Sequence, residues 1–499
     1  MQKKEEKVLS IISDTALTTA QKKHFLSVEG ENILPRINVS TSTKKLYDEG
    51  VLCDLHEGNA PYRPRYVLPN YQKLFENGSE FLGLNPPQDL FEATQTLLIA
   101  YNHVPSITGK PVYLGDVDKL LQPFTKGMSQ EEVYKIIKWF LIAIDRVLAD
   151  GFCHMNIGPE NTLVGRLILK AERELKQPVP NISLKYSPKI TDDELLEEAA
   201  KTALVTGKPH FHNHPLIKEQ LGDYGVVSCY NNLLIGGGSH TLIRINLLKL
   251  ANKSESLEEY LHDLIPAAVD AASELANSRN KFLVEDAKFF ESDFLAQEGL
   301  IDLDKFTSMV GIFGLAEVVN KFSKGTYGKD EEANSIGLKI VEKIYDHLMS
   351  VDAVYCQGTE DKLTLHAQSG ISDDIDETPG TRIPIGDEPE LYQHLCTVIP
   401  MHKYFNSGIS DIFIFDQTVK DNPKAMCDII KGAMKQGIRT FTANQEDSEL
   451  IRITGYLIKR SDLENFSNNK KNLQLSGNLG AEAVVNQRIL NRKVRKLHE

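Results

Sequence analysis

Alternating strand-like and helix-like segments constrain the fold of this chain more than any other feature. The segment "NISLKYSP" (181–188) predicts a strand, "TDDELLEEAAKTALVTG" (191–207) a helix ended by glycine, and "KPHFHNH" (208–214) the next strand. Two strands separated by one helix are normally parallel neighbours in a sheet. The alternation continues over about 300 residues, as far as the strand "DIFIFD" (411–416) and a helix over 422–437. The pattern therefore favours one large α/β barrel or sheet.

Further helices and the length of 499 residues suggest how the chain is divided. Helices are predicted over 129–151, where Ser129 and Glu132 form a capping box, and over 256–278 and 331–351. We expect a helical or irregular N-terminal region (1–100), an α/β barrel (101–430) and a polar C-terminal region (431–499) that docks on the barrel.

The charge balance and the short apolar runs argue against two classes of partner. Lys and Arg number 56 and Asp and Glu number 69, which gives a net charge of −13. Nucleic-acid binding relies on phosphate neutralisation by Lys and Arg, so an acidic chain argues against it. The start "MQKKEEKVLSIISD" lacks the apolar core of a secretory signal, and runs such as "WFLIAI" are too short to span a bilayer. We expect a cytoplasmic protein that binds neither nucleic acid nor membrane.

The spacing of cysteine and histidine residues gives no clear metal site. The six cysteines are at least 31 residues apart, which fits no zinc motif, and we expect them to be reduced. His210, His212 and His214 alternate, so on a strand all three would face one side. Such a row could bind a metal but lacks a fourth ligand, and it is more often a polar pocket wall. We predict no metal site.

A glycine interrupts the stretch "SELIRITGYLIKRSDLENF" (448–466), which otherwise has the pattern of a buried β-strand. A glycine in a strand usually marks a bulge or a close approach of another backbone. The chemical alternative is that Gly455 has two hydrogens on Cα and no side chain. Loss of one hydrogen leaves a planar radical, stabilised by the amide nitrogen on one side and the carbonyl on the other. The residue alone leaves both interpretations open.

Several segments resemble one family of enzymes. "RITGY" (452–456), with 44 residues after the glycine, is similar to the radical-bearing segment Arg-Val-x-Gly-aromatic of the glycyl radical enzymes, with Ile453 in place of valine. "MVGIFGLAEVVNKF" (309–322) and "TLIRINLLKLA" (241–251) resemble segments of the class III anaerobic ribonucleotide reductases, with Leu248 in place of a proline. Over residues 50–499 the chain resembles the YjjI family, a reductase-like branch of the glycyl radical enzymes.

The resemblance implies a fold and a set of site residues. The fold would be a ten-stranded α/β barrel with surrounding helices, followed by a glycyl radical domain over 431–499. In this family a cysteine moves hydrogen atoms between the buried glycine and the substrate, because its S–H bond is weak. "GDYGVVSCYNNLLIGGGSH" (222–240) predicts a loop between strands that carries Cys229, so Gly455 and Cys229 are the expected catalytic residues. The expected substrate contacts are His214, Asn246, Glu317 and Asn156.

The same resemblance implies the partners. A separate radical-SAM activase would install the radical with S-adenosylmethionine and an iron–sulfur cluster, neither of which this chain would bind stably. The substrate would be a small polar molecule, and a homodimer is expected from the family.

Departures from the family patterns leave alternatives open. Ser228 precedes Cys229 where pyruvate formate-lyase has a second cysteine, and Asn231 stands where dehydratases have the glutamate of Cys-x-Glu. One alternative is nucleotide reduction like that of the anaerobic ribonucleotide reductases, which would need a second thiol, Cys53 or Cys356, near Cys229. The other is a non-catalytic barrel or radical repair subunit, in which Gly455 is only structural.

Overall fold

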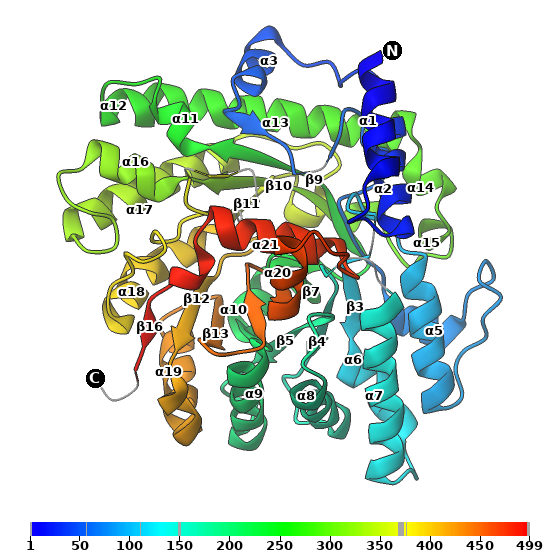
Figure 1. Ribbon diagram of the computed structural model, residues 1–499. Coiled ribbons are helices and arrows are strands. Elements are labelled where there is room, and N and C mark those ends of the chain that lie inside the picture. The colour runs from blue at the N-terminus through cyan, green and yellow to red at the C-terminus, as the bar shows by residue number, and fades with distance from the viewer. Residues whose placement is uncertain are drawn as a thin grey trace.

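Two central sheets lie among layers of helices. The computed structural model describes residues 2–55, 57–109, 111–147, 151–367, 374–375 and 377–496. The C-terminal helices α20 (Arg460–Ser467) and α21 (Leu475–Asn486) cross the middle of the face shown in Figure 1, in front of the strands. The N-terminal helices α1 (Gln2–Ser13) and α2 (Thr19–Glu31) lie beside them, and α3 (Thr41–Asp48) follows. Gln21 of α2 donates a hydrogen bond to the Asn472 carbonyl at 3.3 Å, which joins the two ends of the chain.

The larger sheet contains the predicted strand–helix–strand unit. Its strands, in spatial order, are β16 (Val494–Arg495), β12 (Asp411–Phe415), β13 (Thr440–Gln445), β6 (His210–Asn213), β5 (Asn181–Tyr186), β4 (His154–Ile157) and β3 (Tyr113–Asp116). Strands β3 to β6 are parallel, and β13 is antiparallel to β6. The prediction for this unit is confirmed, because β5 and β6 are parallel neighbours joined by α9 (Asp193–Thr206).

The smaller sheet packs across from the larger one. Its strands are β1 (Leu52–Cys53), β9 (Gly237–Asn246), β10 (Phe306–Phe313) and β11 (Thr364–Ala367), with β2 (Tyr66–Leu68) also paired to β9. Strands β9, β10 and β11 are parallel, whereas β1 and β2 are antiparallel to β9. The segment before β12 extends this sheet, because the Ser407 amide donates to the Leu365 carbonyl at 3.2 Å. The two sheets therefore approach each other beside β11 and β12.

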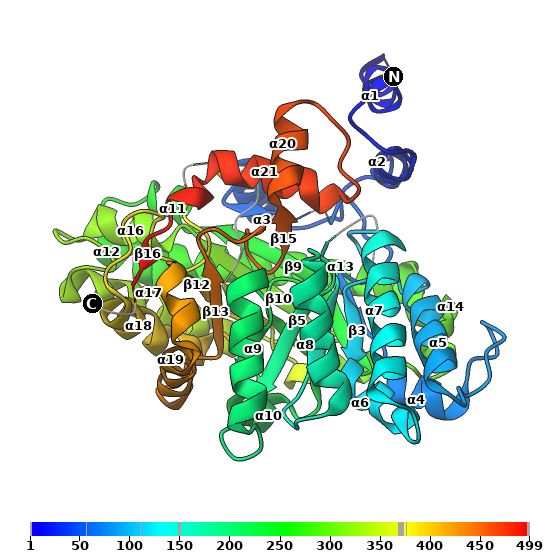
Figure 2. The same cartoon turned by 60° about the horizontal axis from the view of Figure 1, so that its bottom comes forward.

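Helices cover the outer faces of both sheets. The larger sheet is covered by α5 (Leu90–Asn102), α7 (Gln130–Val147), α8 (Leu163–Leu175), α9 and α19 (Pro423–Lys435), of which Figure 2 shows α7, α8 and α9 side by side. The smaller sheet is covered by α11 (Leu247–Ala251), α13 (Ile265–Lys281), α16 (Leu315–Phe322) and α17 (Glu331–Ser350). Shorter helices in the connections are α4 (Tyr71–Asn77), α6 (Val117–Leu121), α10 (His214–Leu221), α14 (Phe289–Ser292), α15 (Phe294–Gln297) and α18 (Leu391–Val398).

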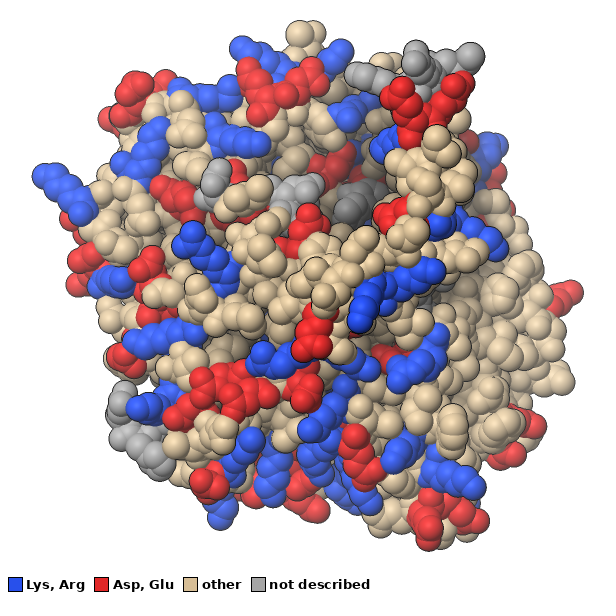
Figure 3. Space-filling model, viewed as in Figure 1, with Lys and Arg blue, Asp and Glu red and all other residues tan. Residues whose placement is uncertain are grey.

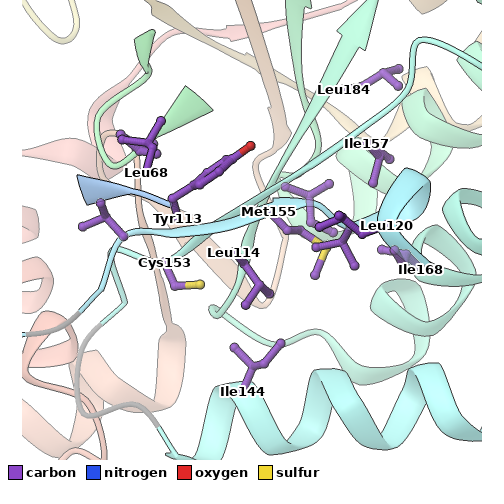
Figure 4. Packing of buried hydrophobic residues seen from close by; sticks show 14 of the residues in the cluster. Leu68, Tyr113, Leu114, Leu120, Ile144, Cys153, Met155, Ile157, Ile168 and Leu184 are labelled. Carbon is purple, nitrogen blue, oxygen red and sulfur yellow. The ribbon is translucent and has the colours of Figure 1, made fainter. Parts of the chain in front are cut away.

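Strands β4, β5, β6 and β13 of the larger sheet turn their apolar residues outward. Met155 and Ile157 of β4 and Leu184 of β5 pack in one buried cluster with Ile144 of α7 and Ile168 of α8 (Figure 4). Successive side chains of a strand point to opposite faces, so the residues that alternate with this set face inward. They are polar: His154, Asn156, Asn181, Ser183, Lys185, His210, His212, Thr440 and Thr442. We call the space in front of these residues the lumen.

The structure refines several predicted elements. The helix predicted over 129–151 is α7, and residues 148–150 lie outside the described residues. The helix predicted over 256–278 consists of α12 (Leu257–Glu259), a π-helical turn (Tyr260–Leu264) and α13. The expectation of one strand through 448–466 is wrong, because β14 (Leu450–Arg452) and β15 (Leu457–Lys459) form an antiparallel hairpin with a turn at 453–456.

The proposed three-part division of the chain stays a prediction. Strands β1 and β2 of the smaller sheet fall within 1–100, and β13 of the larger sheet falls within 431–499. Both outer regions thus contribute strands to the central sheets.

None of the helices in the described residues has the length and hydropathy needed to cross a membrane. On the face shown in Figure 3, acidic and basic side chains are intermingled over the helices.

Candidate active site

A β-hairpin enters the lumen from the carboxyl ends of β4, β5 and β6. This hairpin, which we call the cysteine hairpin, consists of β7 (Tyr224–Val227) and β8 (Asn231–Leu234), and it follows α10 directly. At its base, Lys185 Nζ of β5 donates to the Tyr224 carbonyl at 2.6 Å. Further along, Asn156 of β4 bonds both backbone groups of Val226, at 3.0 and 2.8 Å. The hairpin is therefore clamped at two points along its first strand.

The tip of this hairpin presents Cys229. The three tip residues lie between paired Val227 and Asn231. Ser228 and Tyr230 have φ angles of 47° and 66°, a left-handed conformation that costs a non-glycine residue on the order of 1–3 kcal/mol. Such strain persists only where the surroundings fix the backbone, and Tyr66 helps by donating to Ser228 Oγ at 3.2 Å. The thiol is thus held at a rigid tip, with Cys229 only 8% exposed.

A second hairpin, β14–β15, which we call the glycine hairpin, enters the lumen from the amino ends of β4, β5 and β6. Arg452 donates to Asn181 Oδ1 at 2.9 Å and to the Gly207 carbonyl. Arg492, near the C-terminus, donates to the carbonyls of Arg452 and Ile453 at 2.9 and 3.2 Å. Side-chain donors on backbone carbonyls therefore position the turn that contains Gly455.

The two hairpins meet at Gly455. A Cβ built on Gly455 would overlap the Ser228 carbonyl oxygen and the Cα of Cys229, and would lie 2.8 Å from the Ser228 carbonyl carbon. Cys229 Sγ lies 3.8 Å from Thr454 Oγ1. The two catalytic residues expected from the sequence, 226 positions apart, are therefore in direct contact.

The close approach explains why this position is glycine. Gly455 does not have the left-handed φ that favours glycine in turns, so its backbone conformation does not require a glycine. The atoms that a side chain would meet are backbone atoms of Ser228 and Cys229, which cannot move aside as a flexible side chain could.

Apolar side chains seal the contact. Ile453 is fully buried and Tyr456 is 6% exposed, and the Tyr456 ring packs on Phe152 with centroids 4.9 Å apart. Gly455 itself is buried. Exclusion of water and oxygen from such a site protects a reactive intermediate.

The polar groups around the contact include neutral histidines and cationic arginines. Burial lowers the pKa of His154 to about 3 and holds those of His210 and His212 well below their usual range. Burial also lowers the pKa of Arg452 to about 10 and of Arg492 to about 9, values at which both stay protonated at pH 7.

Two of the predicted substrate contacts lie along the first hairpin. The side-chain amide of Asn156 is used in its two hydrogen bonds to the Val226 backbone. His214 is the first residue of α10 and not part of β6, and its Nδ1 lies 3.1 Å from the Tyr224 hydroxyl at the hairpin base. His210 and His212 remain on β6, with the His210 ring 4.7 Å from that of Tyr230 between centroids. His214 thus lies at the base of the hairpin and not at the tip that carries the thiol.

The other two predicted substrate contacts come together at the carboxyl ends of β9 and β10. Asn246 ends β9 and donates to Glu377 Oε1 at 2.7 Å, while Glu317 lies in the first turn of α16 and accepts a bond from Thr378. Burial raises the pKa of Glu317. Glu317, Glu377 and Thr378 line a cavity of about 320 Å³ together with Arg488.

The two candidate second thiols do not lie beside Cys229. Cys356 belongs to the buried layer between the smaller sheet and its outer helices, where Asn280 contacts its sulfur at 3.5 Å. Cys53 pairs with Arg244 on β9, whereas Tyr66, which reaches the cysteine tip, pairs with Ser239. Five residues along a strand correspond to roughly 17 Å.

Comparison with known proteins settles the family. A family model described as "Glycyl radical enzyme YjjI-like" matches residues 17–495. The chain belongs to the YjjI-like glycyl radical enzymes. Protein YjjI of Escherichia coli (strain K12) is 43% identical to this YjjI-like enzyme over 503 residues, which cover 99% of this chain and 97% of that protein. Enzymes of the wider class carry a glycyl radical that an activating enzyme installs.

Solved structures confirm the fold class. An anaerobic ribonucleotide reductase matches with a TM-score of 0.66 at 13% identity, covering 92% of this chain and 90% of its own. Hydroxyproline dehydratase from Clostridioides difficile, with trans-4-hydroxy-L-proline bound, matches with a TM-score of 0.69 at 11% identity, covering 99% and 88%. The predicted α/β fold of the glycyl radical enzymes is thereby confirmed. Among the described residues of the YjjI-like enzyme, hydrogen-bonded strands form the two sheets described above.

Sequence reasoning missed the residues that hold the turn around Gly455 in place. His154 Nε2 lies 2.8 Å from the Gly455 carbonyl oxygen, and Tyr230 donates to the Thr454 carbonyl at 2.6 Å. The alternation of His154 and Asn156 in "HMNI" was an available signal for an inward-facing pair. Nothing local marks Arg492, which contacts the turn from some 40 residues away.

Proposed function

We propose that Gly455 carries the radical of this enzyme and that Cys229 relays it to the substrate. The observation that carries the proposal is the direct packing of Gly455 on the Ser228–Cys229 backbone, inside a buried site. A hydrogen atom can pass between two such groups without a chain of intermediates. The alternative of a structural glycine accounts for the contact but not for a strained cysteine tip aimed at it.

The relay conserves atoms and electrons. The Gly455 radical takes the hydrogen atom of the Cys229 thiol, which restores the glycine and leaves a sulfur-centred radical. That radical then takes a hydrogen atom from a C–H bond of the substrate, which restores the thiol and leaves a substrate radical. After the substrate radical has reacted and recovered a hydrogen atom, the sulfur radical can return to Gly455.

The partners of this chemistry follow from the proposal. A radical-SAM activase would remove the first hydrogen from Gly455 with S-adenosylmethionine and its own iron–sulfur cluster. We place the enzyme in the cytoplasm, where its cysteines stay reduced, and propose a homodimer as in the wider family. The intermingled surface charges and the net charge of −13 support a small molecule and not a nucleic acid as substrate.

The polar lumen supports a small polar substrate. Among the predicted contacts, we retain Asn246 and Glu317 as substrate-binding candidates, since both lie at the carboxyl ends of parallel strands beside a cavity. Ligands of α/β sheets bind at that end of the strands. We propose that Asn156 and His214 serve the site indirectly, by holding the cysteine hairpin.

Anaerobic activation tests this proposal. Incubation with the activase, a reductant and S-adenosylmethionine should give a glycine-centred doublet in electron paramagnetic resonance. Exposure to air should then cut the chain at Gly455 and release the 44 residues that follow it. A chain that yields no doublet with a competent activase would contradict the radical assignment.

Two serine variants separate the thiol from the glycine. Cys229→Ser should keep the doublet but consume no compound from an anaerobic small-molecule extract followed by mass spectrometry. Cys396→Ser, at an exposed cysteine, is the matched control and should keep both properties. Consumption by Cys229→Ser at the wild-type rate would assign the chemistry to another residue.

A further inference from the structure

The two carbonyl groups that flank the Cα of Gly455 each face one buried donor. The Thr454 carbonyl, on the amino side, accepts from the Tyr230 hydroxyl at 2.6 Å. The Gly455 carbonyl, on the carboxyl side, lies 2.8 Å from His154 Nε2. His154 belongs to β4 and Tyr230 to the cysteine hairpin, so neither donor belongs to the segment that it holds.

The proton of His154 has a defined place. Burial lowers the pKa of this histidine to about 3, so the ring is neutral at pH 7 and has one N–H group. A carbonyl oxygen can only accept, so the proton must be on Nε2. The other nitrogen, Nδ1, is buried and has no hydrogen-bond partner among the described residues. His154 is therefore a fixed donor to Gly455.

The two donors act on the radical in opposite ways. An unpaired electron on the Gly455 Cα spreads into the carbonyl of the same residue and draws density from its amide nitrogen. A hydrogen-bond donor on the Gly455 carbonyl increases the spread of the electron into that carbonyl. A donor on the Thr454 carbonyl pulls the nitrogen lone pair toward that carbonyl and so weakens the donation from the Gly455 nitrogen to the radical. Both bonds act at full strength because no water competes for these buried oxygens.

We infer that His154 is a positioning residue that stabilises the radical through its hydrogen bond to the Gly455 carbonyl, whereas Tyr230 fixes the neighbouring peptide plane. No atom moves in this role, since the proton stays on Nε2 throughout. The inference rests on the proposed function, because it requires the radical to form on Gly455. It adds a residue that tunes how much radical is present and how it is distributed.

Three substitutions in the full-length protein, activated anaerobically, provide the test. His154→Leu removes the donor, and His154→Gln keeps an N–H group at about the reach of Nε2. His240→Leu is the matched control, because His240, on β9, is also buried with Nε2 2.8 Å from a backbone carbonyl, that of Tyr355. Thermal unfolding verifies that each variant is folded.

The expected results differ among the three. His154→Leu should lower the radical content per chain about fivefold, the scale of one lost hydrogen bond, and widen the doublet as spin density returns to Cα. His154→Gln and His240→Leu should leave both quantities at the wild-type values. If His154→Leu does not fold, His154→Asn takes its place, because its shorter amide cannot reach the carbonyl.

Tyr230→Phe separates electronic tuning from a loosened turn. Loss of the hydroxyl returns the lone pair to the Gly455 nitrogen, so the doublet should narrow. An unchanged doublet and radical content in His154→Leu, or equal widening in His154→Leu and Tyr230→Phe, would overturn the inference. A wild-type protein with no doublet at all would refute the proposed function, which is a different and recognisable outcome.

Discussion

The two hairpins that meet at Gly455 are held in different ways. The cysteine hairpin is fixed by its own strand pairing, by the two bonds from Asn156 to Val226 and by a bond from Lys185 at its base. In both hairpins the strands pair only with each other among the described strands, but the cysteine hairpin also has a backbone bond to the segment beside β11, from the Asn232 amide to the Ser407 carbonyl at 3.0 Å. The turn of the glycine hairpin is held by side chains. Arg492, His154 and Tyr230 bond its backbone carbonyls, and Arg452 of the hairpin itself bonds Asn181.

This difference separates a fixed element from a removable one. Withdrawal of the glycine turn would break side-chain bonds, whereas withdrawal of the cysteine hairpin would also break its backbone bond to Ser407. An activating enzyme must reach a glycine that is buried in the resting structure. The glycine hairpin is therefore the segment that we expect to leave the lumen.

Substitution of the glycine at the contact should have the largest effect. In Gly455→Ala the new methyl group overlaps the Ser228 and Cys229 backbone, so we expect complete loss of the doublet and a lower melting temperature. The glycine turn should also become sensitive to proteases, since it is the element that can yield. Gly432→Ala, in α19 with open space at its Cβ, is the control and should be neutral or stabilising. A fully stable Gly455→Ala with an intact turn would contradict the close contact.

Acid should loosen the glycine hairpin through His154. Burial places its folded-state pKa at about 3, below an unfolded value of about 6.5. The stabilising contribution is therefore complete above pH 6.5 and is lost as the pH falls toward 3, by at most about 1.4 kcal/mol per pH unit for one histidine. Urea unfolding at pH 7, 6 and 5 should show this slope, and His154→Gln should reduce it. An identical slope in His154→Gln would contradict the assignment.

Removal of one side chain that holds each hairpin should change amide hydrogen exchange in that hairpin alone. Arg492→Met should speed amide hydrogen exchange over 450–459 by the equivalent of about 1–3 kcal/mol and leave 224–234 unchanged, because it frees the carbonyls of Arg452 and Ile453. Asn156→Leu should do the reverse. Equal effects of both variants on both hairpins would show that the two segments move as one unit.

The smallest expected effect concerns Ser228 at the cysteine tip. Ser228→Ala removes the bond from Tyr66 but no backbone pairing, so the free energy of unfolding should fall by about 1 kcal/mol. The doublet should be retained. A loss of several kcal/mol in chemical denaturation would mean that the tip depends on this hydroxyl more than on the hairpin pairing.

The sequence predicts the Gly455–Cys229 pair and much of the fold, but not the way in which the pair is held. The motif around Gly455 and the glycine-rich setting of Cys229 are local patterns, and the strand–helix–strand unit over 181–214 follows from local periodicity. The hairpin form of 450–459 was missed because the apolar alternation runs straight through a turn that is fixed by tertiary contacts. The clamps from Asn156, His154 and Arg492 depend on distances between remote segments, which no local pattern encodes.

Hydrogen exchange through the thiol is the decisive measurement for transfer between Cys229 and Gly455. In heavy water the Cys229 thiol carries deuterium, so each passage of the radical from glycine to sulfur places that deuterium on the Gly455 Cα. A return step in which the sulfur radical takes the protium then leaves a deuterated glycyl radical. We expect the doublet of the activated wild-type protein to collapse to a much narrower line in heavy water, whereas that of Cys229→Ala should keep its full splitting. A doublet that persists in the wild type, or collapses equally in Cys229→Ala, would contradict hydrogen transfer between these two residues.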